Sequence, residues 1–223
     1  MAIVAAGKGV RLGNATPKQF LVLGGRPVFA HSLELFDGLD FVTDIALVVP
    51  RDGGLPDEHR RWLGGLNHAI KVVAGGARRQ ESVANGLAAL DAPYDVALVH
   101  DAARPFPSPW AIAELARAAA ERGGGLLAAR ATDTVKRSGK EQVVVETIDR
   151  GTIWLAQTPQ AIRADLVARA IEEFNDPAVD VTDEAALLET WGVQVALVES
   201  TAQNFKITVA EDLLRAESIL KKS

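Results

Sequence analysis

Glycines and positively charged side chains alternate near the start of the chain. The run Ala5-Ala6-Gly7-Lys8-Gly9-Val10-Arg11-Leu12-Gly13 is followed by Lys18. Glycines let a backbone turn tightly and approach a ligand closely, and the N–H groups of such a loop can bind phosphates. Three cations, Lys8, Arg11 and Lys18, beside this loop could therefore neutralise a triphosphate. The spacing matches neither G-x-G-x-x-G nor the P-loop, which needs Gly-Lys-Ser/Thr, so a flexible turn with solvated charges stays open as the alternative.

A carboxylate follows another apolar segment, where a parallel strand would deliver a side chain to a ligand. Asp101 comes directly after Val96–His100, and ligands in open α/β sheets bind beyond the carboxyl ends of strands. Mg²⁺ is typically held by one or two carboxylates together with phosphate oxygens. Asp101 is therefore a candidate magnesium ligand, with a helix cap or a turn as the alternative, whereas we expect His100 to be structural.

Composition excludes several classes of function. The 223 residues include no cysteine, which rules out disulfides, thiolate catalysis and cysteine-ligated metal sites. A formal net charge of −5 disfavours a general nucleic-acid binder, which would need a basic surplus. No apolar run reaches the roughly 18–20 residues of a membrane-spanning helix. The first residues are typical of a strand rather than a signal peptide, so we expect a cytoplasmic protein.

Short apolar segments alternate with helical segments along the chain, and several of them lack polar alternation, as strands buried on both faces of a parallel sheet do. The predicted strands are Ile3–Ala6, Ile45–Val49, Val72–Ala74, Val96–His100, Leu126–Ala131 and Val193–Val198. The predicted helices are Val28–Phe36, Glu81–Leu90, Trp110–Glu121 with Ser108 as N-cap and Pro109 in its first turn, and a last helix that runs from a capping box at Thr208–Glu211 to Lys221 and Lys222. This order predicts an α/β fold, a Rossmann-like three-layer sandwich with a mostly parallel central sheet.

One segment interrupts this order. Thr134–Ile148 reads as two extended pieces around Ser138-Gly139-Lys140, which predicts an inserted β-hairpin. An isolated hairpin is marginal in water and needs a partner surface, for which a second copy of the chain is the simplest candidate. We therefore expect residues 1–223 to form one domain, with a dimerisation arm at about 133–156.

Five sets of motifs occur in a fixed order. They are Ala5-Ala6-Gly-x-Gly-x-Arg11 with Pro17-Lys18-Gln19, Gly75-Gly76 with Arg79-Gln80-Glu81-Ser82-Val83, His100-Asp101-Ala102-Ala103-Arg104-Pro105, Asp133-Thr134-Val135-Lys136, and Thr158-Pro159-Gln160 with Thr182-Asp183-Glu184-Ala185. The first resembles the signature of sugar-phosphate nucleotidyltransferases. The whole set, from about Ile3 to Leu220, resembles the 2-C-methyl-D-erythritol 4-phosphate cytidylyltransferase family of the non-mevalonate (methylerythritol phosphate) route to isoprenoids.

The resemblance implies one reaction. A phosphate oxygen of methylerythritol phosphate attacks the α-phosphorus of CTP, so that 4-diphosphocytidyl-2-C-methyl-D-erythritol forms and pyrophosphate leaves. Because the nucleophile is already an anion, no strong general base is needed. Catalysis should then consist of positioning and charge neutralisation.

The resemblance also implies roles for individual residues. The implied catalytic cations are Arg11, Lys18 and Lys206. The implied nucleotide-binding residues are Ala5, Ala6, Gly7, Gly9, Gly75, Gly76 and Ser82. The implied sugar-phosphate contacts are Asp101, Arg104, Thr134, Arg150, Thr158 and Thr182, and Asp101 would hold Mg²⁺ or a similar divalent cation. The family often has an acidic residue at the position of Ala77, so only the backbone contacts of that loop carry over.

Structural roles for these residues stay open as alternatives. Arg11, Lys18 and Lys206 could be surface cations, and Arg104 could form a structural salt bridge. Thr134 could be an ordinary strand residue, Arg150 a turn charge, and Thr182 a helix N-cap as well as a contact. Arg79 is expected to serve the glycine loop structurally and is left out of the core site. The family's arm crosses to a second subunit, which implies a homodimer.

Two other functions compete with this interpretation. A ribitol 5-phosphate cytidylyltransferase would share the CTP-binding opening, and a non-catalytic nucleotide-binding module would need fewer of the four charged residues Arg11, Lys18, Asp101 and Lys206. A nicotinamide-dependent oxidoreductase is excluded by the glycine spacing. The chain also ends near the last predicted helix, so we expect no fused cyclodiphosphate synthase domain.

Overall fold

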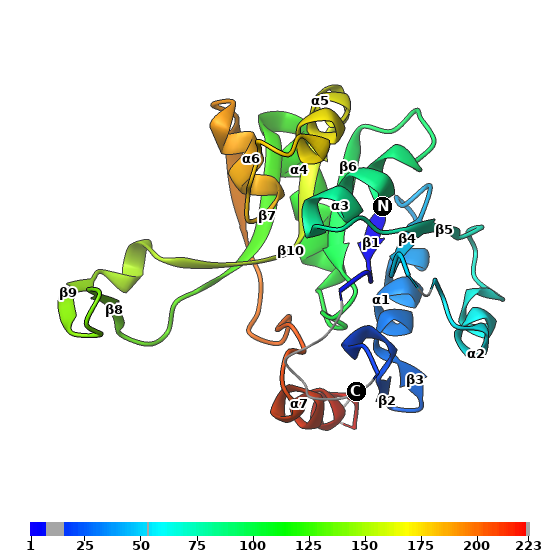
Figure 1. The fold of residues 1–223 in the computed structure, drawn as a ribbon, viewed down its shortest axis with the longest axis horizontal. Coiled ribbons are helices and arrows are strands. Elements are labelled where there is room, and N and C mark those ends of the chain that lie inside the picture. Colours follow the sequence, from blue (N-terminus) through cyan, green and yellow to red (C-terminus); the bar gives the residue numbers. More distant parts are fainter. Residues whose placement is uncertain (8–15, 53, 222–223) are drawn as a thin grey trace.

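A seven-stranded sheet forms the centre of the protein (Figure 1). The computed structural model describes residues 1–7, 16–52 and 54–221. The strand order is β11-β7-β10-β6-β1-β4-β5, with bounds β1 (Ala2–Val4), β4 (Ala46–Val49), β5 (Lys71–Ala74), β6 (Val96–Asp101), β7 (Gly123–Arg130), β10 (Trp154–Arg163) and β11 (Gln194–Glu199). β10 runs antiparallel to β6 and β7, and the other neighbouring strands are parallel. The predicted α/β fold with a mostly parallel sheet is confirmed.

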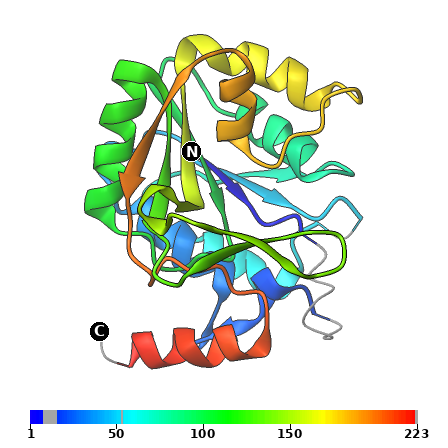
Figure 2. The ribbon, with the colours of Figure 1, turned by 90° about the vertical axis from the view of Figure 1, so that its left-hand side faces the viewer.

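Helices cover both faces of this sheet, as Figure 2 shows. On one face α1 (Val28–Asp37) and α4 (Pro109–Arg122) pack into a core around Phe29, Phe36 and Leu115. On the other face α3 (Arg79–Ala88), α5 (Ala164–Asn175) and α6 (Glu184–Thr190) pack into a second core. The three predicted layers are therefore present. None of the helices within the described residues is long and apolar enough to span a membrane.

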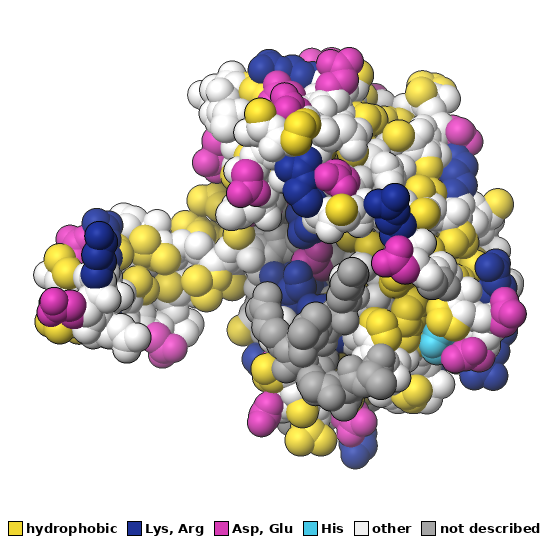
Figure 3. Space-filling model, in the orientation of Figure 1, with side chains coloured by type: hydrophobic (Ala, Val, Ile, Leu, Met, Phe, Trp, Pro, Cys, Tyr) yellow, Lys and Arg dark blue, Asp and Glu magenta, His cyan; other side chains and the backbone are white. Residues whose placement is uncertain are grey.

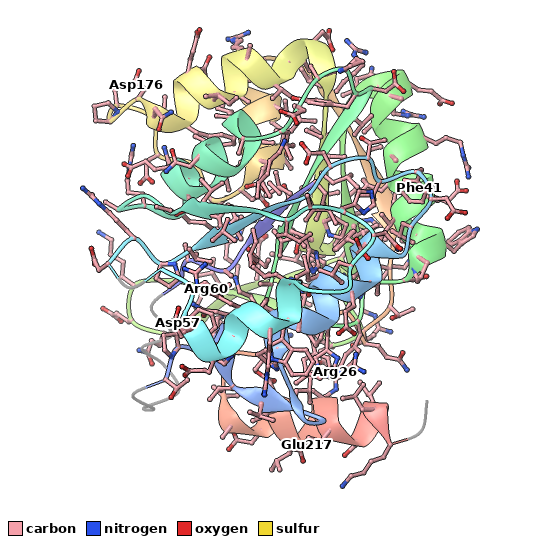
Figure 4. The ribbon with its side chains drawn as sticks, turned by 90° about the vertical axis from the view of Figure 1, so that its right-hand side faces the viewer. Arg26, Phe41, Asp57, Arg60, Asp176 and Glu217 are labelled. Atoms are coloured by element: carbon pink, nitrogen blue, oxygen red, sulfur yellow. The ribbon has the colours of Figure 1, made fainter. Side chains whose placement is uncertain are left out.

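Smaller elements surround these layers. They are β2 (Val22–Leu23), β3 (Arg26–Pro27), α2 (Asp57–Arg60), α7 (Ala210–Leu220) and the short 3-10 helices η2 (Lys18–Phe20), η3 (Arg61–Leu63) and η4 (Arg150–Thr152). Figure 4 shows α2 on the outside of α1 and α7 below both. Leu23 and Val28 are buried together with Ile207 and with Ala216 of α7. This packing fixes the segment around Ile207, which leads into α7.

The start of α1 at Val28 matches the sequence prediction, whereas the starts of α3, α4 and α7 differ from it by one or two residues. The Ser108 cap is confirmed, because its Oγ accepts from the Ala111 N–H at 3.5 Å. The predicted capping box at Thr208 and Glu211 is wrong by one residue: α7 begins at Ala210, so that Asp212 occupies the third helical position and accepts from the Thr208 N–H at 2.7 Å. Likewise Asp183, not Thr182, caps α6, through the Ala186 N–H at 2.9 Å.

β10 was not predicted at all. Its middle reads Gln157-Thr158-Pro159-Gln160, and the pairing with β7 shifts register between Ala156 and Gln160. Proline and polar residues are unusual inside a central strand, because proline cannot donate to the ladder. The irregular pairing accommodates them, and buried polar partners described below satisfy the side chains.

The predicted hairpin is present as β8 (Val135–Ser138) and β9 (Val144–Ile148). The two strands extend away from the body of the molecule as an arm (Figure 1). Val143, Val144 and Val145 on this arm are 62%, 58% and 67% exposed. Three consecutive valines of the hairpin are therefore exposed in this chain.

Glycines in β7 let two helices pack closely against the sheet. A Cβ at Gly124 would lie 2.3 Å from Leu188 Cδ1 of α6, and one at Gly125 would lie 2.9 Å from Leu115 Cδ1 of α4. Both distances are too short for any side chain. The position of α6 on the sheet, and with it the position of Glu184, therefore depends on these glycines.

Gly124→Ala is expected to lower the free energy of unfolding by about 1–3 kcal/mol, because overpacking a tight core forces a helix or a side chain to move. Urea denaturation of the purified protein measures this change. Gly64→Ala is the matched control: Gly64 is exposed, and its added Cβ would meet the Arg61 carbonyl oxygen at an ordinary 3.6 Å. Equal unfolding midpoints for both variants would contradict the packing argument.

Candidate active site

The carboxyl ends of the parallel strands surround one cavity. Val4 at the end of β1 is in register with Asp101 at the end of β6, and the loop after β5 follows beside them. The cavity has a volume of about 380 Å³. It is lined by Val4, Ala5, Ala6, Gly7, Lys18, Gln19, Gly76, Ala77, Arg78, Arg79, Ser82, Asp101, Ala103, Lys206 and Thr208. In Figure 3 basic and acidic side chains lie close together in the hollow at the centre of the molecule.

Two ion pairs converge on Asp101 in this cavity. Asp101 Oδ2 lies 2.6 Å from Lys206 Nζ, and Asp101 Oδ1 lies 3.3 Å from Arg79 Nη2. The Asp101 side chain is 11% exposed. Burial alone would raise the pKa of Asp101, but the charges of Arg79 and Lys206 outweigh it and hold the pKa well below its usual range. Asp101 is therefore ionised at neutral pH.

A second, fully buried carboxylate holds Arg79 from the other side. Glu184, the first residue of α6, accepts from Arg79 Nη1 at 2.7 Å and from Nη2 at 3.4 Å. The charge of Glu184 raises the pKa of Arg79 above its ordinary value. One guanidinium thus bridges an internal carboxylate and the carboxylate of the cavity. Residues from four distant segments form a continuous chain of alternating charges, in the order Glu184, Arg79, Asp101, Lys206.

The loop after β5 is packed too tightly for side chains at its two glycines. A Cβ at Gly75 would lie 2.6 Å from Ala6 Cβ, and one at Gly76 would lie 2.3 Å from Glu81 Cβ. Ser82 Oγ accepts from the Gly76 N–H at 3.0 Å and donates to the Arg78 carbonyl at 3.2 Å. The glycines are thus required by internal packing, and the Ser82 hydroxyl is used within the loop.

Further hydrogen bonds fix this loop. Glu81 accepts from the Ala77 N–H at 2.8 Å and from Arg78 Nε at 2.7 Å. Arg78 also donates to the carbonyl oxygens of Val179 at 3.0 Å and Asp176 at 3.2 Å, and Asp176 lies at the end of α5 (Figure 4). The segment that carries Thr182 is therefore tied to the glycine loop.

Thr158 lies inside the protein, between Asp101 and His100. Its Oγ1 accepts from the Asp101 N–H at 3.0 Å and lies 3.1 Å from His100 Nδ1. His100 Nε2 lies 2.9 Å from the Arg104 carbonyl oxygen. Since a carbonyl only accepts, the proton is on Nε2, and the Thr158 hydroxyl donates to Nδ1. Burial lowers the pKa of His100 to about 4, so the structure agrees with a neutral, structural histidine.

The cavity brings together about half of the residues that the sequence pointed to. Those that line it are Ala5, Ala6, Gly7, Lys18, Gly76, Ser82, Asp101 and Lys206. Gly75 is buried directly behind the cavity lining, and Arg104 is half-buried and donates to the Asn204 carbonyl at 2.7 Å. Gly9 and Arg11 lie outside the described residues.

The remaining predicted contacts lie elsewhere on this chain. Thr134 and Arg150 are exposed on the arm, where Arg150 Nη1 donates to the Thr132 carbonyl. Thr182 is exposed just before α6, and Thr158 is buried with its hydroxyl in use. A single copy of the chain does not bring the two arm residues to the cavity.

Two charged residues of the site could not be recognised from the sequence. Arg79 was expected to serve only the loop, yet it lines the cavity and contacts Asp101, which corrects that expectation. The motif that contains Glu184 indicates no role for it. Both stand at the first position of a helix, and their pairing over 105 residues of sequence could not be read from either motif alone.

Only one carboxylate of the described residues, Asp101, lines this cavity. Within residues 1–7, 16–52 and 54–221, no group of three or more His, Asp or Glu side chains could hold a metal ion. A hard cation that is bound by one carboxylate together with phosphate oxygens fits such a donor set. The contacts of Asp101 Oδ1 to Arg79, at 3.3 and 3.4 Å, are long, so this oxygen has acceptor capacity left.

Comparison with known proteins gives a consistent set of similarities. Residues 1–222 match the family model described as IspD: 2-C-methyl-D-erythritol 4-phosphate cytidylyltransferase. The chain is 44% identical to the 2-C-methyl-D-erythritol 4-phosphate cytidylyltransferase of Chromobacterium violaceum, over 98% of this chain and 96% of that protein. It is 45% identical to the bifunctional enzyme IspD/IspF of Anaeromyxobacter dehalogenans, over 98% of this chain and 56% of that protein. The chain thus spans about half the length of such bifunctional relatives.

Solved structures show the same architecture. The 2-C-methyl-D-erythritol 4-phosphate cytidylyltransferase of Thermus thermophilus superposes with a TM-score of 0.80 and 31% identity, over 99% of this chain and 98% of that chain. The 4-diphosphocytidyl-2C-methyl-D-erythritol synthase of Anaerococcus prevotii superposes with a TM-score of 0.86 and 29% identity, over 99% of this chain and 94% of that chain. The similarity thus extends through the arm as well as the sheet.

The buried histidine predicts a pH dependence of stability. With a pKa of about 4 in the folded protein and about 6.5 when unfolded, His100 binds its proton more tightly in the unfolded chain. The free energy of unfolding therefore falls as the pH drops from about 6.5 towards 4. Between pH 7 and pH 5 this loss should be about 2 kcal/mol larger in the wild type than in His100→Gln. Urea unfolding at both pH values measures it, and equal losses would disprove a neutral His100.

Proposed function

We propose, from the premise that this chain belongs to the 2-C-methyl-D-erythritol 4-phosphate cytidylyltransferase family, that it transfers CMP from CTP to 2-C-methyl-D-erythritol 4-phosphate in isoprenoid biosynthesis. The observation that carries the proposal is the convergence of Lys18, Arg79 and Lys206 on one cavity at the carboxyl edge of the sheet. These cations come from distant segments of a chain whose net charge is −5. Such a local positive cluster fits a polyanionic ligand.

The chemistry needs charge neutralisation more than proton transfer. A phosphate oxygen of the sugar phosphate forms a bond to the α-phosphorus of CTP, and the bond from that phosphorus to the pyrophosphate oxygen breaks. Both reactants are anions. The cations of the cavity therefore lower the barrier by reducing the repulsion between the two substrates and by stabilising the negative charge that develops in the transition state. His100, neutral and buried, has no part as a general base in this scheme.

Lys18 and Lys206 would hold the phosphates of CTP, together with Arg11 of the glycine-rich opening. Cytosine presents an amino donor where uracil presents a carbonyl acceptor. The N–H groups of Gly76 and Ala77 are already bonded to Ser82 and Glu81. Backbone carbonyl oxygens around the cavity, from Ala5 and Ala6 to Gly76, would therefore read the base and favour CTP over UTP.

Asp101 is the residue that would hold Mg²⁺ or a similar divalent cation, together with phosphate oxygens of the nucleotide. The ion would supply further neutralisation of phosphate charge. Thr158 would act through Asp101, because its hydroxyl fixes the Asp101 backbone N–H at 3.0 Å. Arg104 and Thr182 would contact the sugar phosphate from the same chain.

The arm would complete the site of a second copy in a homodimer. Its exposed valines would be covered by a partner. The strands β8 and β9 extend away from the body (Figure 1), and Thr134 and Arg150, which flank them in the sequence, do not line the cavity of their own chain. An arm that crosses to a partner would bury the valines and deliver both polar side chains. The segment at about 133–156 is thus proposed as the dimerisation arm.

A coupled pyrophosphate-release assay tests the function. We expect release with CTP and 2-C-methyl-D-erythritol 4-phosphate in the presence of Mg²⁺, and a rate at least about tenfold lower with ATP, GTP or UTP. Excess EDTA should abolish release. Turnover with ribitol 5-phosphate but not with methylerythritol phosphate would identify the alternative enzyme. No release with any pair would leave a non-catalytic nucleotide-binding module.

Arg150→Ala should raise KM for the sugar phosphate by roughly 10- to 100-fold, since a charged hydrogen bond to phosphate contributes about 1.5–3 kcal/mol. KM for CTP should change less than about twofold, because the proposed contact is to the other substrate. Arg137→Ala is the matched control on the same arm, where Arg137 pairs with Glu146 at 2.8 Å and is 65% exposed. An unchanged KM for the sugar phosphate in Arg150→Ala would reject this assignment.

A further inference from the structure

The two proposed ligand-binding charges of the cavity form an ion pair with each other. Lys206 Nζ lies 2.6 Å from Asp101 Oδ2, and both side chains line the same cavity. Lys206 is the proposed phosphate ligand and Asp101 the proposed cation ligand. While the pair stays closed, each charge is largely neutralised by the other and attracts its own ligand only weakly. Strong binding of either ligand therefore requires the pair to open.

A triphosphate that arrives without a divalent cation would open this pair at a high cost. Lys206 would turn to the phosphates, and the Asp101 carboxylate, 11% exposed, would keep only its long contacts to Arg79. A nearly buried carboxylate would then face an anionic ligand, and like charges in contact are strongly unfavourable. Metal-free nucleotide should therefore bind weakly.

A divalent cation without nucleotide meets the reverse problem. Binding at Asp101 would displace Lys206, whose ammonium would remain beside the cation with no anion to receive it. Arg79, also at the cavity, adds a further positive charge at 3.3 Å from Asp101 Oδ1. The cation alone should therefore bind weakly as well.

We propose that the Asp101–Lys206 ion pair is exchanged for two new pairs, Asp101 with the divalent cation and Lys206 with the triphosphate, and that neither ligand opens it efficiently alone. The inference rests on the proposed function, because it concerns the same site. It goes further by making the protein itself a source of positive coupling between cation and nucleotide, in addition to their complex in solution.

Glu184 makes this exchange possible. If Arg79 closed on Asp101, it would take the place of Lys206 and occupy both carboxylate oxygens. Glu184 instead holds Arg79 at 2.7 Å, which leaves the Arg79–Asp101 contacts at 3.3 and 3.4 Å. Arg79 thus keeps the Asp101 carboxylate in place during the exchange without competing fully for it, and Glu184 acts as its positioning residue.

The first test is calorimetric titration of CTP with and without Mg²⁺, in the wild-type chain and in Asp101→Asn. The wild type should bind CTP at least about tenfold more weakly in EDTA than in Mg²⁺. Asp101→Asn should bind CTP in EDTA about tenfold more tightly than the wild type does, because the repelling carboxylate is gone and Lys206 is released. Mg²⁺ should change the affinity of this variant less than about threefold.

The second test uses Mn²⁺ alone, followed by its EPR signal in the absence of nucleotide. Lys206→Gln should bind Mn²⁺ about tenfold more tightly than the wild type, since Asp101 loses its competing ammonium. Lys71→Gln is the matched control: Lys71 pairs with Asp44 at the same 2.6 Å and is 31% exposed, against 34% for Lys206. Lys71 lies outside the cavity lining, so Lys71→Gln should leave the affinities for Mn²⁺ and for CTP unchanged.

Asp101→Asn that binds metal-free CTP no more tightly than the wild type would overturn the exchange, and so would Lys206→Gln that gains no Mn²⁺ affinity. Urea unfolding of both variants shows whether either fails to fold. If one fails, the binding result of the other variant decides whether the exchange takes place. The failure of the proposed function is distinct. It would appear as a wild type that releases no pyrophosphate, whatever the variants bind.

Discussion

The site depends on a buried carboxylate that must be compensated. Glu184 is fully buried at the start of α6, and an unpaired charge at such a place would be strongly destabilising. Arg79 compensates the charge of Glu184, and the same guanidinium also contacts Asp101 at the end of β6. The buried charge of Glu184 thus fixes the position of Arg79, Arg79 contacts Asp101, and Asp101 pairs with Lys206 in the cavity. Four segments of the chain are joined by electrostatics rather than by secondary structure.

Neutral hydrogen bonds behind the cavity support this charged chain. Thr158 of β10 fixes the backbone of Asp101, and His100 completes the set by bonding to both Thr158 and the Arg104 carbonyl. The glycine loop is fixed in the same way by Ser82 and Glu81. The side chains of Thr158, His100, Ser82 and Glu81 behind the cavity are thus paired inside the protein. The charged side chains that line the cavity remain available for ligands.

Local sequence predicts six strands of the central sheet and four helices, but not β10, α5 or α6, and it predicts none of the long-range pairs. Apolar segments such as Ile45–Val49 indicate strands because burial on both faces needs continuous hydrophobicity. β10 escaped prediction because Thr158 and Gln157 are satisfied by partners far along the chain. Asp101 could be proposed from its position at a strand end, and Lys206 from the family resemblance. The pairing of Arg79 with Glu184 could not, since it depends on how α6 packs on the glycines of β7. Thr134 and Arg150 lie on the predicted arm, but no local sequence pattern indicates which cavity they would contact.

The root of the arm is continuous with the sheet. β7 leads into it and β10 leads out of it, with Trp154 paired to Arg130 and Leu155 to Ala129. The direction in which the arm leaves the body is thereby dictated by two rigid neighbouring strands and not by a flexible tether. The tip at Gly139–Gln142, by contrast, lies beyond the register pairs of β8 and β9, and exposed loop tips of this kind are expected to accept changes in length. A longer or shorter tip would accordingly leave the direction of the arm unchanged, because that direction is fixed at the paired root.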